Sequence, residues 1–110
     1  MKLTKENLES CPIITAQRVL SSKWSLIIIF ILQDQPMRFN ELLRMFDGMS
    51  HATLAKQLKQ LESSGIVHRE VYNQIPPKVE YSLTNLGHQL EPTLKCLSDW
   101  SELYIKHFNQ

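Results

Sequence analysis

Side chains that can hydrogen-bond or pair with an anion gather in one segment of this sequence, residues 50–78. Two lysines and two glutamines stand among leucines in its first half, and polar side chains surround a proline-containing loop in its second half. Such side chains neutralise phosphates and read the edges of bases, so the segment is a candidate binding surface. Together with one arginine upstream, the candidate contacts are Arg38, Ser50, His51, Ala52, Thr53, Lys56, Lys59, Gln60, Asn73, Gln74 and Lys78.

The first part of this segment, about 50–63, has the pattern of an amphipathic helix. Three leucines spaced i, i+4, i+7 form one stripe, and Ser50 is expected to cap the N-terminus. A rotation of about 100° per residue places two lysines and no acid on the opposite side. An ordinary solvated helix face is the competing interpretation. The stripe is Leu54, Leu58 and Leu61, and the opposite face carries Ala52, Lys56, Lys59 and Ser63.

Shorter elements complete the arrangement around this helix. Asn40 is expected to cap a preceding helix over 41–46, after a short extended segment at 37–39. Two strand-like runs, about 66–72 and 78–83, are expected to pair as an antiparallel hairpin, a wing over 66–83. Helix, turn, helix and a two-stranded ribbon is the layout of a winged helix-turn-helix, which places its second helix in the major groove of DNA.

Helical segments are also expected before this arrangement. Residues 1–10 are polar and should be helical at most in part, whereas Pro12 suits the first position of a short apolar helix. Residues 23–33 are apolar nearly all round, which favours a central buried helix with Ser22 as its cap. The chain is therefore predicted to be mainly α, with a small antiparallel β-wing.

The C-terminal segment, about 84–108, carries a long apolar stripe and is expected to begin at Thr84. Pro92 should kink or break the helix near Glu91. A small domain cannot cover so long a stripe by itself, so its far end predicts the interface of a homodimer. The side chains expected there are Leu94, Leu97, Trp100, Tyr104 and Phe108.

Length and composition bound the class of protein. The chain has 110 residues, 43% of them hydrophobic, and a formal net charge of +1. These values fit one soluble globular domain over 1–110, with a core of about 11–100. The longest apolar run, Leu26–Leu32, is far shorter than the roughly 20 residues of a membrane span, and the N-terminus has no signal-peptide pattern. We therefore expect a cytoplasmic protein with no membrane partner.

Several longer motifs carry a specific resemblance, which covers about 11–100. The sequence closely resembles the HxlR family of bacterial transcription regulators, winged helix-turn-helix proteins akin to the MarR group. The resemblance implies a homodimer that binds double-stranded DNA near promoters, with the N- and C-terminal helices building the interface. Ser21-Ser22 stands where the family commonly has Gly-Gly; either pair can end and restart a helix. The motifs are Cys11-Pro12, Ser22-Lys23-Trp24, Arg38-Phe39-Asn40-Glu41-Leu42, Leu54-Ala55-Lys56-Gln57-Leu58, the run from Gly65 to Tyr72, the run from Pro76 to Thr84, and Leu86-Gly87.

Cys11 is the candidate sensor of a small-molecule or oxidant signal. It stands at the start of a predicted helix, where the helix dipole favours the reactive thiolate. Some HxlR relatives use a cysteine at this position to sense oxidants or electrophiles such as quinones and aldehydes. The alternative is a packed or capping residue. Cys96 lies in the region of the C-terminal stripe and is expected to be packed.

No other pattern indicates catalysis. The four histidines do not fall at metal-ligand spacings, and the sequence contains neither a glycine-rich phosphate loop nor a supported nucleophile–base arrangement. We predict a non-enzyme without metal or cofactor. The alternative function is a winged-helix module that binds a protein partner and not DNA.

Overall fold

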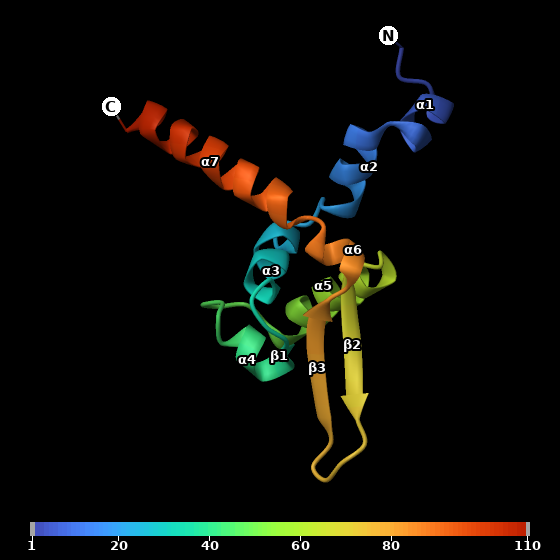
Figure 1. Cartoon of the computed structure of the whole chain (residues 1–110), viewed down its shortest axis with the longest axis vertical. Coiled ribbons are helices and arrows are strands. Elements are labelled where there is room, and N and C mark those ends of the chain that lie inside the picture. The colour runs from blue at the N-terminus through green and yellow to red at the C-terminus, as the bar shows by residue number, and fades with distance from the viewer. Residues whose placement is uncertain (1, 110) are drawn as a thin grey trace.

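The chain folds into a mainly helical structure with a small antiparallel sheet (Figure 1). This computed structural model describes residues 2–109. The sheet has the order β1-β3-β2, so β3 is central and pairs with both neighbours. This is the predicted winged helix-turn-helix. The elements are α1 (Lys5–Ser10), α2 (Pro12–Val19), α3 (Ser25–Leu32), β1 (Met37–Arg38), α4 (Phe39–Leu43), α5 (His51–Ser63), β2 (Val67–Tyr72), β3 (Lys78–Leu83), α6 (Asn85–His88) and α7 (Glu91–Phe108).

The core lies where α3, α4 and α5 meet the base of the sheet. The leucine stripe of α5 is fully buried, as its spacing predicts, and it packs with one face of α3. The first residues of β2 and the last of β3 close the core from the sheet side. The buried apolar residues are Ile28, Ile29, Leu32, Leu42, Leu54, Leu58, Leu61, Ile66, Val67, Leu83 and Leu94.

Two predicted helix starts are wrong. The helix expected over 41–46 is α4, Phe39–Leu43, and Arg38 rather than Asn40 is its N-cap. The Glu41 carboxylate accepts the Arg38 backbone N–H at 2.9 Å, which stabilises the earlier start. Similarly, α3 begins at Ser25 and not at residue 23, because Ser22 Oγ already accepts the Trp24 N–H at 3.1 Å in a turn ahead of the helix.

The expected burial of α3 is also only half right. Ile28, Ile29 and Leu32 are buried, but Leu26, Ile27 and Phe30 on the other side are exposed. An apolar run without periodicity cannot indicate which side faces the core. The exposed side adds to the apolar surface that the chain leaves uncovered.

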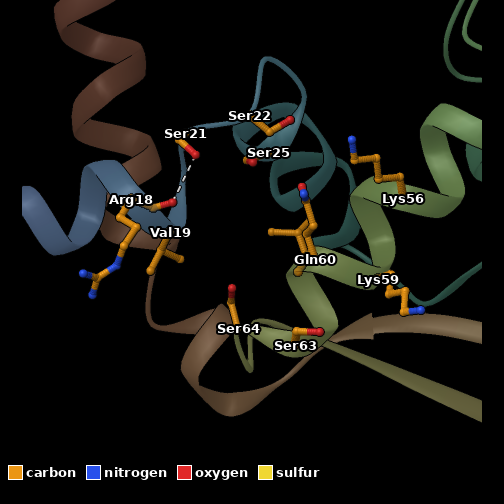
Figure 2. A pocket seen from close by; sticks show the side chains of 11 residues that line it. Arg18, Val19, Ser21, Ser22, Ser25, Lys56, Lys59, Gln60, Ser63 and Ser64 are labelled. Atoms are coloured by element: carbon orange, nitrogen blue, oxygen red, sulfur yellow. Dashed lines mark hydrogen bonds between the residues drawn. The ribbon is translucent and has the colours of Figure 1, made fainter.

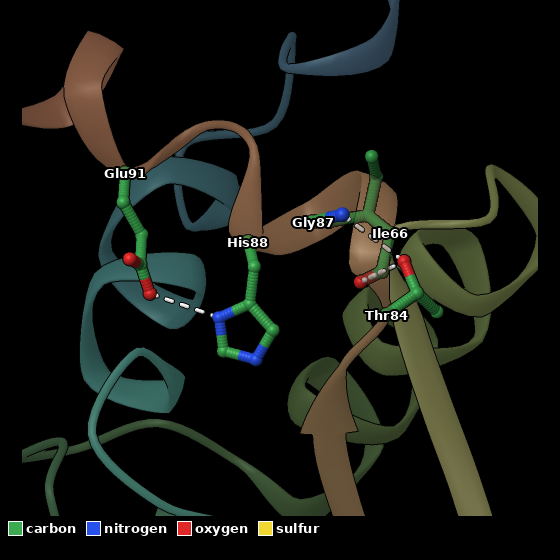
Figure 3. Close-up of polar contacts among 5 residues, drawn as sticks. All are labelled: Ile66, Thr84, Gly87, His88 and Glu91. Atoms are coloured by element: carbon green, nitrogen blue, oxygen red, sulfur yellow. Dashed lines mark hydrogen bonds and ion pairs between the residues drawn. The ribbon is translucent and has the colours of Figure 1, made fainter.

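The C-terminal segment breaks as predicted near Glu91. Helix α6 ends at His88 and α7 begins at Glu91, with Pro92 in the first turn, where its missing N–H costs nothing. Thr84 ties this break to the sheet (Figure 3). Its N–H donates to the Ile66 carbonyl at 3.0 Å, and its Oγ1 accepts the Gly87 N–H at 3.0 Å.

Gly87 is required by the close approach of α6 to the start of β2. A Cβ at this position would lie 2.4 Å from the Ile66 carbonyl oxygen, which belongs to the backbone and cannot move aside. We expect Gly87→Ala to lower the free energy of unfolding by about 1–3 kcal/mol, measured by urea denaturation. The control is Asn85→Ala, an exposed position in the same short helix. Equal midpoints for the two variants would contradict this packing.

The terminal helices project from the core in different directions (Figure 1). The radius of gyration is 16.4 Å, against roughly 13 Å for a compact domain of this length. Among residues 2–109, Leu94 is the one residue of α7 that belongs to the core, and most of this 18-residue helix is exposed. Within residues 2–109, no helix is long and apolar enough to cross a membrane.

Candidate nucleic-acid interface

The turn between α4 and α5 sets the direction in which α5 leaves the core. Gly48 has φ 83°, in the left-handed region that favours glycine, and the chain then extends to Ser50. Ser50 caps α5 as predicted, because its Oγ accepts the Thr53 N–H at 3.1 Å. The same hydroxyl donates to Thr53 Oγ1 at 2.8 Å. The first turn of α5 is therefore fixed before any ligand binds.

The outward face of α5 carries the predicted cationic side chains. Lys56 and Lys59 are exposed, as are Ala52 and Gln60, whereas Thr53 is half-buried. Neither lysine takes part in an ion pair within the described part of the chain. Their charges are thus uncompensated and free to meet an anion.

His51 begins α5 and packs on the helix before it. Its ring lies 4.3 Å, centroid to centroid, from the ring of Phe39, and Phe39 in turn approaches Tyr81 of the sheet at 6.5 Å. This contact holds the first turn of α5 against α4 and β3. His51 is nevertheless exposed, so its ring edge can contact a ligand.

The wing is a regular hairpin that extends well beyond the body of the molecule (Figure 1). Asn73 and Gln74 are exposed in its loop. Lys78 already has two partners within the wing: its Nζ lies 3.5 Å from Glu80 Oε2 and 4.9 Å from the centroid of the Tyr72 ring. Hydrogen bonding to Glu80 and the negative charge of that carboxylate raise the pKa of Tyr72, which keeps its phenol protonated. Asn73 and Gln74 are therefore better placed than Lys78 to contact a ligand.

Arg38 lies where the sheet meets α4. It is paired with Glu80 in the β1–β3 register, and its side chain is exposed. Arg38, Arg44 and Lys78 line an open cleft of about 820 Å³ together with Glu41 and Glu80. The two acids offset part of the positive charge there. Two of the predicted contacts, Arg38 and Lys78, are thus brought together, on a less positive surface than α5.

Comparison with known proteins identifies the family. Residues 19–109 match the model of the HxlR-like helix-turn-helix family. The chain belongs to this family. The HTH-type transcriptional regulator YdeP of Bacillus subtilis is 42% identical over 101 residues, which cover 92% of this chain and 79% of YdeP. This HxlR-like chain is therefore a transcriptional regulator that binds DNA through its helix-turn-helix, and regulators of this class act by binding and not by catalysis.

Solved structures extend the likeness to the whole fold. The redox regulator HypR in its reduced form has a TM-score of 0.83 at 41% identity, covering 89% of this chain and 97% of that one. Reduced YodB from Bacillus subtilis has a TM-score of 0.76 at 35% identity, covering 84% and 91%. Structures of HypR in its oxidised form and of diamide-treated YodB are also similar to this regulator.

The two cysteines of the HxlR-like chain are free and differ in setting. Cys11 is half-buried at the junction that closes α1 and opens α2, and its side chain makes no capping hydrogen bond. Cys96 is exposed on α7, so the expectation that it packs within the chain is wrong. Among residues 2–109, no group of three His, Cys, Asp or Glu side chains could hold a metal ion.

The predicted dimer residues on α7 divide into two groups. Leu94 is only 8% exposed and lies in the core, where it is not available to a partner. Leu97, Trp100, Tyr104 and Phe108 are 40% to 67% exposed. The three aromatic rings follow one another along the helix, with centroids 5.4 Å and 4.9 Å apart.

A second cleft beside α5 was not predicted from the sequence. It lies between α5 and the connection from α2 to α3, and Arg18, Ser21 and Ser22 line it opposite Lys56 and Lys59. Ser22 Oγ donates to Gln57 Oε1, which links that connection directly to α5. The sequence signal that could have found this cleft is the set of polar side chains within 18–25, namely Arg18, Ser21, Ser22, Lys23 and Ser25.

Proposed function

We propose that this regulator binds a two-fold symmetric DNA site as a homodimer, with one α5 helix in each of two successive major grooves. The observation that carries the proposal is the outward face of α5, where Lys56 and Lys59 are exposed and form no ion pair with another residue of 2–109. The first turn, His51 to Thr53, would reach base edges, while the lysines meet phosphates. Asn73 and Gln74 at the wing tip would contact the flanking backbone.

The homodimer is supported by apolar surface that the chain leaves uncovered. The stripe from Leu97 to Phe108 is exposed, and exposed apolar patches of this kind mark protein interfaces. Pairing of α7 helices would place two α5 helices at a fixed separation. We expect half-sites roughly 34–36 Å apart, one turn of DNA. Because it acts on chromosomal DNA, we place this regulator in the cytoplasm.

A binding assay on DNA from the protein's own promoter region tests the proposal. Phosphate contacts release counterions, so the logarithm of the association constant should fall linearly with the logarithm of the salt concentration. Absence of binding at 50 mM salt would refute DNA recognition. A protein partner captured by the α5 face in that case would favour the interaction module instead.

We also propose that oxidation of Cys11 weakens DNA binding. HypR and YodB, both similar to this chain, are known in reduced and in oxidised or diamide-treated forms. With hydrogen peroxide, the Cys11 thiolate would take one peroxide oxygen to form a sulfenic acid, and the other oxygen would leave as hydroxide. Cys11 is the C-cap of α1 and the N-cap of α2. Oxidation of its thiol would therefore alter the way these two helices meet.

Substitution of each cysteine in turn tests this role. We expect peroxide to release wild-type protein from DNA and to leave Cys11→Ser bound, in a fluorescence anisotropy titration. Cys96→Ser is the matched control, since it keeps Cys11 and should respond like the wild type. Identical release curves for wild type and Cys11→Ser would show that Cys11 has a structural role only.

A further inference from the structure

The cleft between α5 and the α2–α3 connection has the composition of an anion site (Figure 2). Its volume is about 480 Å³. Lys56 and Lys59 of α5 stand on one side and Arg18 of α2 on the other, with serine hydroxyls between them. No acidic side chain lines this cleft within residues 2–109. None of the three cations forms an ion pair with another described residue.

Ser25 is an independent sign of a ligand. It is 3% exposed and is the one buried polar side chain among residues 2–109. A buried hydroxyl normally has a hydrogen-bond partner, yet none of the hydrogen bonds found in this part of the chain uses the Ser25 hydroxyl. Among residues 2–109, every fully buried side-chain nitrogen or oxygen has a hydrogen-bond partner, so the unpartnered Ser25 hydroxyl must be partly accessible, on the cleft that Ser25 lines. It can donate there to an incoming oxygen.

The backbone adds to this preference for negative charge. Ser25 is the first residue of α3, so the positive end of an eight-residue helix meets the cleft. The Ser25 N–H already donates to the Ser22 carbonyl at 3.3 Å, so the preference for phosphate comes here from the helix dipole. The Ser25 hydroxyl and the start of α3 therefore lie at one cleft, and three cationic residues without ion pairs among residues 2–109 line its sides. The Arg18 guanidinium and the Lys59 ammonium are directed outward from it (Figure 2).

We propose that this cleft receives a phosphate of the DNA backbone next to the groove that α5 enters. The proposal rests on DNA binding by α5, and it adds Arg18 and Ser25 to the interface. DNA is the occupant because Lys56, Lys59 and Gln60 belong both to the cleft and to the outward face of α5. A duplex held on that face passes over the mouth of the cleft. The guanidinium of Arg18 is directed away from the cleft and from α5 (Figure 2). It would therefore contact the DNA strand beyond the rim of the cleft, on the side opposite α5.

The salt dependence of DNA binding measures this contact. We expect Arg18→Gln to lower the slope of the log–log salt plot by about 0.9 and to weaken binding by about 8-fold at 0.1 M salt. The loss should be the same for the promoter fragment and for a random duplex, because phosphates carry no sequence information. Arg18→Lys should keep the slope. Ser25→Ala, which removes only the hydroxyl, should weaken binding to both duplexes without changing the slope.

The matched control is Lys5→Gln, which removes one positive charge from exposed α1 and should leave slope and affinity unchanged. A slope for Arg18→Gln equal to that of Lys5→Gln overturns the proposal while wild-type binding still supports α5 recognition. If wild type does not bind DNA at all, the proposed function itself fails. A cleft that serves free anions would show amide NMR shifts at Ser25 with millimolar inorganic phosphate and no effect of Arg18→Gln on DNA, which also overturns it.

Discussion

Replacing Lys56 and Lys59 together by alanine should weaken DNA binding on the order of 50-fold at 0.1 M salt. Each exposed lysine on the outward face of α5 is expected to neutralise one phosphate, and each such contact contributes about 0.9 to the salt slope. The slope should therefore fall by about 1.8. Fluorescence anisotropy across a salt series measures both quantities, and circular dichroism should show an unchanged fold because both side chains lie outside the core.

The control for this pair is Lys95→Ala with Lys106→Ala. This control also removes two positive charges, but from the side of α7 that lies away from the apolar stripe. DNA affinity and slope should match the wild type. If the α7 pair and the α5 pair lowered affinity equally, net charge rather than the α5 face would govern binding, and the assignment of α5 would be wrong.

Placing acids on the α7 stripe should give the second large effect. Trp100→Glu with Tyr104→Glu puts two charges where the proposed homodimer buries aromatic rings, and aromatic anchors often contribute 2 kcal/mol or more each to association. We expect the dimer dissociation constant to rise at least on the order of 100-fold. Sedimentation equilibrium at micromolar concentration should then show a dimer for the wild type and a monomer for the variant.

Loss of the dimer should also weaken DNA binding. Each protomer would then bind one half-site alone, without the high effective concentration that a bound partner protomer gives it. Lys95→Gln with Lys106→Gln is the control: it changes the net charge by the same two units on the opposite side of α7. It should remain dimeric. A wild-type protein that sediments as a monomer at micromolar concentration would refute the α7 interface.

Local sequence patterns were sufficient to predict the features that belong to a single helix or hairpin. The leucines of α5 fix its buried face at i, i+4, i+7, Ser50 caps it, and Pro92 marks the break before α7. The wing followed from an alternating run at 78–83, a β-rich run before it and the proline loop between them, although β2 begins at Val67 and not at residue 66.

Features that depend on packing between elements could not be predicted in the same way. Leu94 lies on the α7 stripe, but that turn rests on the core, and the stripe alone does not show where the core ends. The exposed side of α3 is as apolar as its buried side, so the sequence does not distinguish them. Arg18 and Ser25 are seven residues apart on different helices, and only the fold brings them to the same cleft as Lys56 and Lys59.

Footprinting of the wild-type protein on its own promoter DNA at 0.1 M salt tests the central claim most directly. Two α5 helices on a dimer predict two protected half-sites of related, inverted sequence, centred about 10–10.5 base pairs apart or at a multiple of that spacing. The Lys56→Ala, Lys59→Ala variant should lose both together. A single protected half-site at saturation, or no protection in the promoter region, would contradict the account.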